Sequence, residues 1–168
     1  MEENYKDEMI VIDNVNRYNE IFGLETKHPL VSIIDLTKST TWPTRAWFRY
    51  EVYALFLKNV KCGDIKYGRQ YYDYQDGTIV CFGPGQITDL ELIQNIQPNA
   101  HGLLFHPDLI RGTSLGQEIK NYSFFSYETN EALHLSEEER QIVMDCLQKI
   151  AIELNHAIDR HSRRLICI

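Results

Sequence analysis

Six histidines are the side chains in this sequence best suited to bind a metal or to move a proton near neutral pH. Two pairs of them, His101 with His106 and His156 with His161, are five residues apart. On a strand this spacing points two side chains to opposite faces, and on a helix it misses the four-residue step that aligns two ligands. No His-x-His occurs. The pattern favours capping, solvated or core histidines, and we expect no metal site and no cofactor.

Signs of nucleophilic or acid–base catalysis are also weak. The four cysteines contain no Cys-x-x-Cys pair, and none has a local signature of an activated thiolate. Carboxylates lie mostly in runs such as Glu137 to Glu139, so no catalytic pair can be singled out. Gly83-Pro84-Gly85 lacks the Lys-Ser or Lys-Thr of a phosphate loop, and Pro84 removes a backbone donor. We therefore expect a binding protein and not an enzyme.

Charge and hydropathy exclude further classes. The 168 residues carry 17 basic and 24 acidic side chains, a net charge of −7, which makes this chain a poor candidate for binding nucleic acid through its phosphates. No apolar run approaches the roughly 20 residues that a membrane helix requires. Met1 to Ile10 is acidic and polar, unlike a secretory signal. We expect a cytoplasmic protein with free thiols and no membrane contact.

Residues 29–106 consist of short β-rich runs separated by turn residues, which predicts a β-barrel of antiparallel strands. Asp76-Gly77 predicts a hairpin between two of these runs. The run from Val52 to Leu57 is almost entirely apolar, which is typical of a strand covered on both faces. The predicted strands are 30–36, 50–57, 64–67, 71–74, 78–82 and 103–105.

Helical patterns flank this β-rich region. Residues 1–28 predict an N-terminal arm with a short helix, which Asp13 can cap and Gly23 can end. Residues 107–135 predict short helices and connecting segments, with Pro107 suited to a first helical turn.

The strongest local signal lies in residues 136–168. Ser136 and Glu139 have capping-box spacing, and they open a long amphipathic helix predicted to reach Arg160. Its apolar stripe can pack on the barrel or face a second copy of the chain. We favour a homodimer, because acids at the helix start and basic residues at its end would pair in an antiparallel arrangement. The predicted dimer-interface residues are Val143, Leu147, Ile150, Leu154 and Ile158.

Aromatic residues are concentrated in the predicted strands. Inward-facing aromatics with hydroxyl groups can form an apolar pocket for a small organic ligand, and the alternative is that they fill the core. The strand aromatics are Tyr50, Tyr53, Phe56, Tyr67, Tyr71, Tyr72, Tyr74 and Phe82. The candidate ligand-binding residues among them are Tyr53, Phe56, Tyr72, Tyr74 and Phe82.

Ordered stretches of the chain carry a family resemblance. They are Tyr53 to Lys58, Tyr72 to Gln86, Phe105 to Ile110, Phe124 to Tyr127 and Asn130 to Glu137. Together they resemble the N-terminal, cupin-like regulatory domain of AraC-type bacterial transcription regulators. The resemblance implies a jelly-roll barrel that senses a small molecule or a partner, followed by helices that dimerise and then by a DNA-binding domain.

That DNA-binding domain is missing from this sequence. We therefore expect a piece of a longer regulator, with the start of a second dimer helix in Arg163 to Ile168. Metal-binding cupins carry His-x-His, whereas residues 45–57 and 86–92 contain no histidine, which argues against cupin metal chemistry.

The predicted fold is mainly β with a C-terminal α-element: a cupin-like, double-stranded jelly-roll β-barrel followed by a long amphipathic helix. The predicted function is an effector-sensing and dimerisation domain that binds an unknown small molecule and reaches DNA only through the missing domain. One alternative is a free-standing cupin-like enzyme acting on a sugar or small organic acid. Another is a dimerisation module with a filled barrel.

Overall fold

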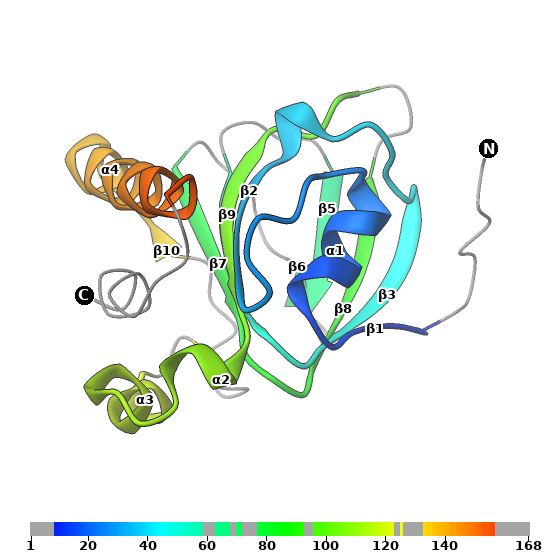
Figure 1. The fold of residues 1–168 in the computed structure, drawn as a ribbon. Coiled ribbons are helices and arrows are strands. Elements are labelled where there is room, and N and C mark those ends of the chain that lie inside the picture. Colours follow the sequence, from blue (N-terminus) through cyan, green and yellow to red (C-terminus); the bar gives the residue numbers. More distant parts are fainter. Residues whose placement is uncertain are drawn as a thin grey trace.

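The computed structural model describes residues 9–58, 77–92, 96–122, 125 and 133–156, and the backbone course of 63–67 and 70–71. Within these residues two five-stranded sheets face each other (Figure 1). Sheet A has the order β1 (Met9–Ile12), β3 (Arg45–Tyr50), β8 (Gln86–Leu92), β5 (Gly63–Tyr67) and β6 (Gln70–Tyr71). Sheet B has the order β10 (Leu133–His134), β7 (Thr78–Phe82), β4 (Tyr53–Lys58), β9 (Ala100–Phe105) and β2 (Val31–Asp35).

Strand pairing makes this a jelly-roll-like sandwich. Neighbouring strands of the described residues run antiparallel, except that β1 runs parallel to β3. A long helix, α4 (Glu137–Leu154), follows the strands. The predicted class, mainly β with a C-terminal helix, is confirmed.

The N-terminal segment belongs to the core of the sandwich. β1 extends sheet A, and α1 (Val15–Phe22) lies between the two sheets (Figure 1). The Tyr18 ring lies 6.4 Å from the Phe48 ring of β3 and 5.8 Å from the Phe56 ring of β4, so it contacts both sheets. Within the predicted N-terminal arm of residues 1–28, the expected short helix is therefore α1, whose apolar face supplies core volume that the strands alone do not fill.

The two ends of α1 can be compared with the predicted cap residues, Asp13 and Gly23. Gly23 ends the helix in the left-handed conformation, with φ of 66°, as predicted. The N-cap is Asn14 and not Asp13: the Asn14 side chain accepts the N–H of Arg17 at 2.9 Å. Asp and Asn both cap helices well. β1 ends at Ile12, so Asp13 is the single residue between the strand and the Asn14 N-cap.

The run predicted as one strand over 50–57 is divided between the two sheets. β3 ends at Tyr50 and β4 begins at Tyr53, with a bend at Glu51 and Val52. The Glu51 N–H donates to the Ile12 carbonyl at 2.9 Å, which ties the bend to β1. The strand pattern does not reveal this corner, because residues on both sides of it, Tyr50 and Val52, are buried in the same core.

β8 was not predicted, because its buried face is partly polar. Gln86 accepts the Gly83 N–H at 2.8 Å and donates to the Phe125 carbonyl at 2.9 Å. Thr88 is hydrogen-bonded to the Tyr50 side chain. These bonds compensate two buried polar side chains that the strand pattern alone does not favour.

The hairpin predicted at Asp76-Gly77 joins the runs 71–74 and 78–82, and most of its first arm and Asp76 lie outside the described residues. β6 pairs with β5 in sheet A, whereas β7 pairs with β4 and β10 in sheet B. Gly77 has a positive φ of 77°, but its N–H donates to the Lys58 carbonyl and its carbonyl accepts the Leu135 N–H. Residues 72–76, including the predicted strand at 72–74, lie outside the described residues.

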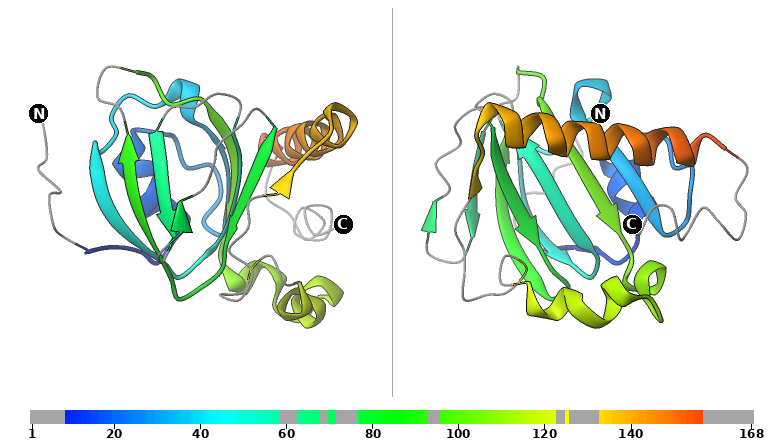
Figure 2. Two further views of the ribbon diagram at one scale, coloured as in Figure 1. Left: turned by 180° about the vertical axis from the view of Figure 1, so that it is seen from behind. Right: turned by 90° about the vertical axis from the view of Figure 1, so that its left-hand side faces the viewer.

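Helices cover the outer face of sheet B. α4 crosses one end of this face, and the short helices α2 (Pro107–Ile110) and α3 (Ser114–Glu118) lie at the other end (Figure 2). Two 3-10 helices, η1 (Leu36–Lys38) and η2 (Ile119–Asn121), complete these connections. The predicted covering of β4 on both faces is confirmed, since Phe56 on one face and Leu57 on the other are buried.

The start of α4 matches its sequence signal. Ser136 accepts the Glu139 N–H at 3.2 Å, and Glu139 accepts the Ser136 N–H at 2.8 Å, which completes the capping box. The helix ends at Leu154, and residues 157–160 of the predicted continuation lie outside the described residues. Among the described helices, none is long and apolar enough to cross a membrane.

Candidate ligand-binding cleft

Two of the predicted ligand-binding residues lie in a closely packed core. Phe56 and Phe82 are 4% and 1% exposed, and their ring centroids are 6.4 Å apart. The Phe82 ring also stacks on the Tyr50 ring at 5.2 Å with an interplanar angle of 11°. These contacts are typical of a filled core and not of the wall of an open pocket.

Tyr53 lies on the opposite face of β4. Its ring stacks on Phe105 at 5.0 Å and meets the edge of Phe125 at 5.2 Å, within the smaller apolar cluster beneath α2 and α3. Burial raises the pKa of the Tyr53 hydroxyl. The structure therefore does not bring Tyr53 together with Phe56 and Phe82, and Tyr72 and Tyr74 lie outside the described residues.

A cleft of about 320 Å³ opens instead on the outer side of sheet B. Four segments far apart in the sequence form it: the chain after α1, edge strand β2, the start of η1 and the last turn of α4. Its volume is at the lower end of the range for small-molecule sites, roughly 300 to 1,000 Å³. The lining residues are Gly23, Leu24, Glu25, Lys27, Val31, Ser32, Ile33, Asp35, Lys38, Ala151 and Leu154.

The edge strand gives this cleft both apolar side chains and backbone hydrogen-bonding groups. β2 pairs with β9, and no described strand pairs with its other edge. Because the His106 N–H bonds the Leu30 carbonyl, the alternation of an antiparallel ladder turns the backbone N–H and C=O of Ile33 away from β9. Ile33 thus offers the cleft one donor and one acceptor beside its apolar side chain.

Charged side chains of both signs surround the apolar floor. Asp35 accepts bonds from the N–H and the hydroxyl of Thr37, at 3.0 and 2.5 Å, which fixes its carboxylate at the cleft margin. His101 Nδ1 lies 3.9 Å from Asp35 Oδ1. On the α4 side, Lys27 donates to the Asn155 side chain at 2.7 Å and so links the chain after α1 to the end of α4.

A buried asparagine holds the wall formed by the chain after α1. The Asn19 side-chain NH2 donates to Thr26 Oγ1 and to Ser32 Oγ, both at 3.0 Å, and its nitrogen lies 3.4 Å from the Glu25 carbonyl oxygen. One side chain of α1 therefore fixes both the chain after α1 and the edge strand. The cleft is consequently anchored on the sandwich side and bounded by a helix on the other.

The cleft combines apolar surface from Leu24, Ile33 and Leu154 with a few polar groups. This composition suits an organic molecule with an apolar body and charged or hydrogen-bonding ends. Among the described residues, no three His, Cys, Asp or Glu side chains gather as a metal site would require.

One motif at the connection between α2 and α3 matches a catalytic pattern. Residues 112–116 read Gly-Thr-Ser-Leu-Gly, which fits the Gly-x-Ser-x-Gly of nucleophile elbows. An elbow lies between a strand and a helix, whereas Ser114 here begins α3 directly after α2. Thr113 accepts the Gly116 N–H at 3.1 Å and caps α3. The motif is therefore a helix connection.

The predicted dimer stripe of α4 faces its own sheet. Leu147 is buried, and Leu154 packs against the apolar cluster that contains Val31. Val143 and Ile150 are half-buried, while Ile158 lies outside the described residues. Of the two arrangements that the sequence allowed, the structure shows the packing of this stripe on its own sandwich, and a role in a dimer stays a prediction.

Sequence reasoning missed the cleft entirely. Its residues come from four segments, and none of these contains a motif that predicts binding. The positive φ of Gly23 is the one local signal that bears on it, because this turn directs the following chain back along β2.

Comparisons with known proteins give a limited result. No family model matches the chain, and no curated protein matches it. Among solved structures, the chain is similar to an apo ToxT variant from Vibrio cholerae, with 10% sequence identity and a TM-score of 0.45. The match covers 85% of this chain and 52% of the other, so this chain spans about half the length of that protein.

Proposed function

We propose that this chain is the effector-sensing domain of a transcription regulator of the AraC type, and that its effector binds in the cleft between β2 and α4. The ordered sequence stretches that resemble such domains, and a sandwich followed by one long helix, support the family assignment. DNA would be bound by another domain, consistent with the net charge of −7 on this chain.

One observation supports the choice of this site: the cleft lies between the sandwich and α4 and is lined by residues of both. Leu24 and Ile33 lie on the sandwich side, and Ala151 and Leu154 lie on α4. A molecule that contacts both sides favours the arrangement in which they are close, and so shifts the population of helix positions. The filled aromatic core offers no comparable route from a ligand to α4.

The packing of α4 makes such a shift physically accessible. Of its described side chains only Leu147 is buried, and the others are half-buried or exposed. Few buried apolar contacts mean that little free energy opposes a small movement of the helix. The Lys27–Asn155 hydrogen bond is exposed and is therefore easily exchanged for bonds to water or ligand.

The proposal is tested by thermal denaturation with a panel of sugars, organic acids and aromatic acids. A ligand at about 100 times its Kd stabilises the protein by roughly 2.7 kcal/mol, which is easily detected. Ala151→Trp fills the cleft and should abolish the shift produced by any stabilising compound. Gln148→Trp, an exposed position on the same helix outside the cleft, is the matched control and should retain it.

A compound whose stabilising effect survives in Ala151→Trp would contradict the cleft as its site. If that effect were instead lost in Phe56→Leu, the aromatic core would be the site. A panel that produces no shift with any compound would count against a small-molecule effector.

A further inference from the structure

β2 is an edge strand whose sequence does not block its free edge. It pairs with β9 on one side, without a bulge, and no described strand pairs with its other side. Proteins commonly protect such edges with proline, lysine or a bulge. The sequence of β2, Val-Ser-Ile-Ile-Asp, contains no proline and no lysine. Because the cleft opens along this edge, β2 stays able to pair with another extended chain.

Backbone groups at every second residue of β2 face this free edge. The alternation that turns the N–H and C=O of Ile33 away from β9 applies equally to Val31 and Asp35, two residues before and after it. All three residues line the cleft. Since a strand rises about 3.4 Å per residue, these groups recur roughly every 7 Å along the cleft. That repeat matches the backbone of an extended peptide.

Apolar surface lies on both sides of this edge. Opposed residues of neighbouring strands place their side chains on the same face of a sheet. Side chains opposite Val31 and Ile33 would therefore lie towards α4, where Leu154 packs in one apolar cluster with Val31. Side chains opposite Ser32 would lie towards the chain after α1, where Leu24 packs against the main core. An added strand would thus have an apolar wall on each face.

We propose that the cleft takes an extended peptide, which adds a strand to the free edge of β2 between α4 and the chain after α1. The proposal rests on the proposed function for its site, and it specifies the chemical class of the ligand. Backbone hydrogen bonds to Ile33 supply affinity, and apolar side chains at alternate peptide positions supply selectivity.

Charged side chains at the cleft favour an acidic residue at one end of the peptide. Asp35 is already engaged, since its carboxylate accepts two hydrogen bonds from Thr37. Lys27, Lys38 and Glu25 are exposed, and none of the three forms an ion pair with the described residues. Glu25 is close to Lys27 in sequence, whereas Lys38 directly follows β2 on η1. We therefore expect an acidic peptide residue beside Lys38, in an exposed pairing of modest strength.

The test measures peptide binding to the unsubstituted chain by fluorescence anisotropy. The probes are fluorescein-labelled heptapeptides of the form Asp-X-Thr-X-Thr-X-Asp, in which X is alanine, valine, leucine, isoleucine or phenylalanine. The tightest of these is also made with one N-methyl group, either on the central X or on the threonine after it. In an added strand, alternate peptide N–H groups face β2 and the others face away. One methylated form should therefore bind at least about tenfold more weakly, and the other should bind nearly as well as the parent.

Substitutions in the chain test the same contacts from the other side. Ile33→Pro removes the N–H that faces the cleft and preserves the hydrogen bonds to β9, because proline is tolerated on an edge strand where the N–H points outward. It should weaken binding about tenfold or more, whereas Ile33→Val, which keeps the N–H, should not. Circular dichroism checks that both variants fold, and the methylated peptides test the pairing without any substitution.

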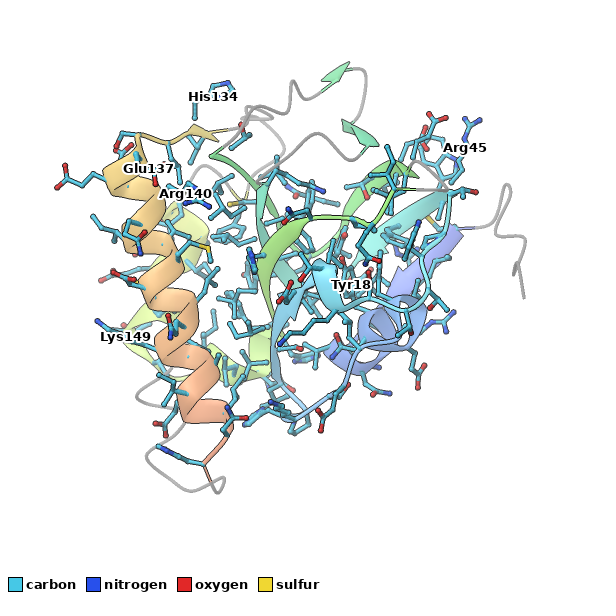
Figure 3. All side chains as sticks on the ribbon, turned by 90° about the horizontal axis from the view of Figure 1, so that it is seen from above. Tyr18, Arg45, His134, Glu137, Arg140 and Lys149 are labelled. Carbon is cyan, nitrogen blue, oxygen red and sulfur yellow. The ribbon has the colours of Figure 1, made fainter. Side chains whose placement is uncertain are left out.

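Lys38→Glu tests the expected charge pairing. It should weaken binding of the acidic-ended peptides roughly threefold or more, because it replaces attraction with repulsion. Lys149→Glu is the matched control and should leave binding unchanged. Lys149 is exposed and points away from the sandwich (Figure 3), and it does not line the cleft.

Three results would overturn the peptide as ligand: no binding by any heptapeptide up to about 1 mM, equal effects of the two N-methyl groups, or full binding by folded Ile33→Pro. The proposed function would still stand if a small compound stabilised the chain and lost that effect in Ala151→Trp. Conversely, binding with the alternating N-methyl pattern would support strand addition even if the small-molecule panel gave no shift.

Discussion

The two faces of sheet B are packed to very different degrees. On the inner face, Phe56 and Phe82 are enclosed by α1 and sheet A, with ring contacts in several directions. On the outer face, α4 buries one side chain and leaves a cleft beside β2. Phe56 and Phe82, two of the aromatic residues that suggested a pocket, pack in this interior, whereas the cleft lies beside β2.

The largest expected loss of unfolding free energy is for a substitution of Phe82 on the inner face. Phe82→Ala should cost about 3–5 kcal/mol of unfolding free energy, because a 1% exposed ring leaves a cavity that its neighbours cannot fill. Urea unfolding measures the loss, and Phe82→Leu should cost clearly less. A loss below about 1 kcal/mol for Phe82→Ala would mean that the ring borders open space.

A smaller loss of unfolding free energy is expected for substitutions on α4, and it should differ between the buried and the exposed face of the helix. Leu147→Ala should cost about 2 kcal/mol, near the lower end for buried leucines, because only one side of the helix is covered. Ile142→Ala, at a position 57% exposed, should change stability by less than about 0.5 kcal/mol. Both are measured by urea unfolding at a protein concentration where the chain is monomeric. Equal losses would contradict the assigned faces.

The smallest expected effect concerns His28, between α1 and β2. Burial lowers the pKa of His28 below 6.5, and its Nδ1 accepts the Leu30 N–H at 3.0 Å. As pH falls below about 6.5, the unfolded chain takes up a proton that the folded chain resists, so stability decreases until the folded pKa is passed.

Thermal unfolding between about pH 7.5 and about pH 5 detects this dependence. His28→Gln should flatten part of it, whereas His156→Gln, at an exposed position, should leave it unchanged. An identical pH profile in His28→Gln and the unsubstituted chain would show that another group is responsible.

Local signals explain which elements were predictable. Helix ends were predictable because capping involves residues within one helical turn, so residue type alone indicates them. The examples are the Ser136–Glu139 capping box, Pro107 at the start of α2 and Gly23 at the end of α1. The division of residues 50–57 between two sheets was not predictable, because Tyr50 and Val52 are buried in one core and no Gly or Pro marks the bend at Glu51. β8 was missed because Gln86 and Thr88 are buried by partners elsewhere in the chain.

The amino-acid sequence by itself determined the mainly β class, the capping of α4 and the apolar stripe along that helix, because these depend on residue type and spacing over a few positions. Only the tertiary structure decided that this stripe contacts sheet B, that Phe56 and Phe82 lie in the core and where the cleft opens. Those outcomes depend on contacts between segments distant in sequence, and such contacts are set by how the two sheets and α1 share one interior.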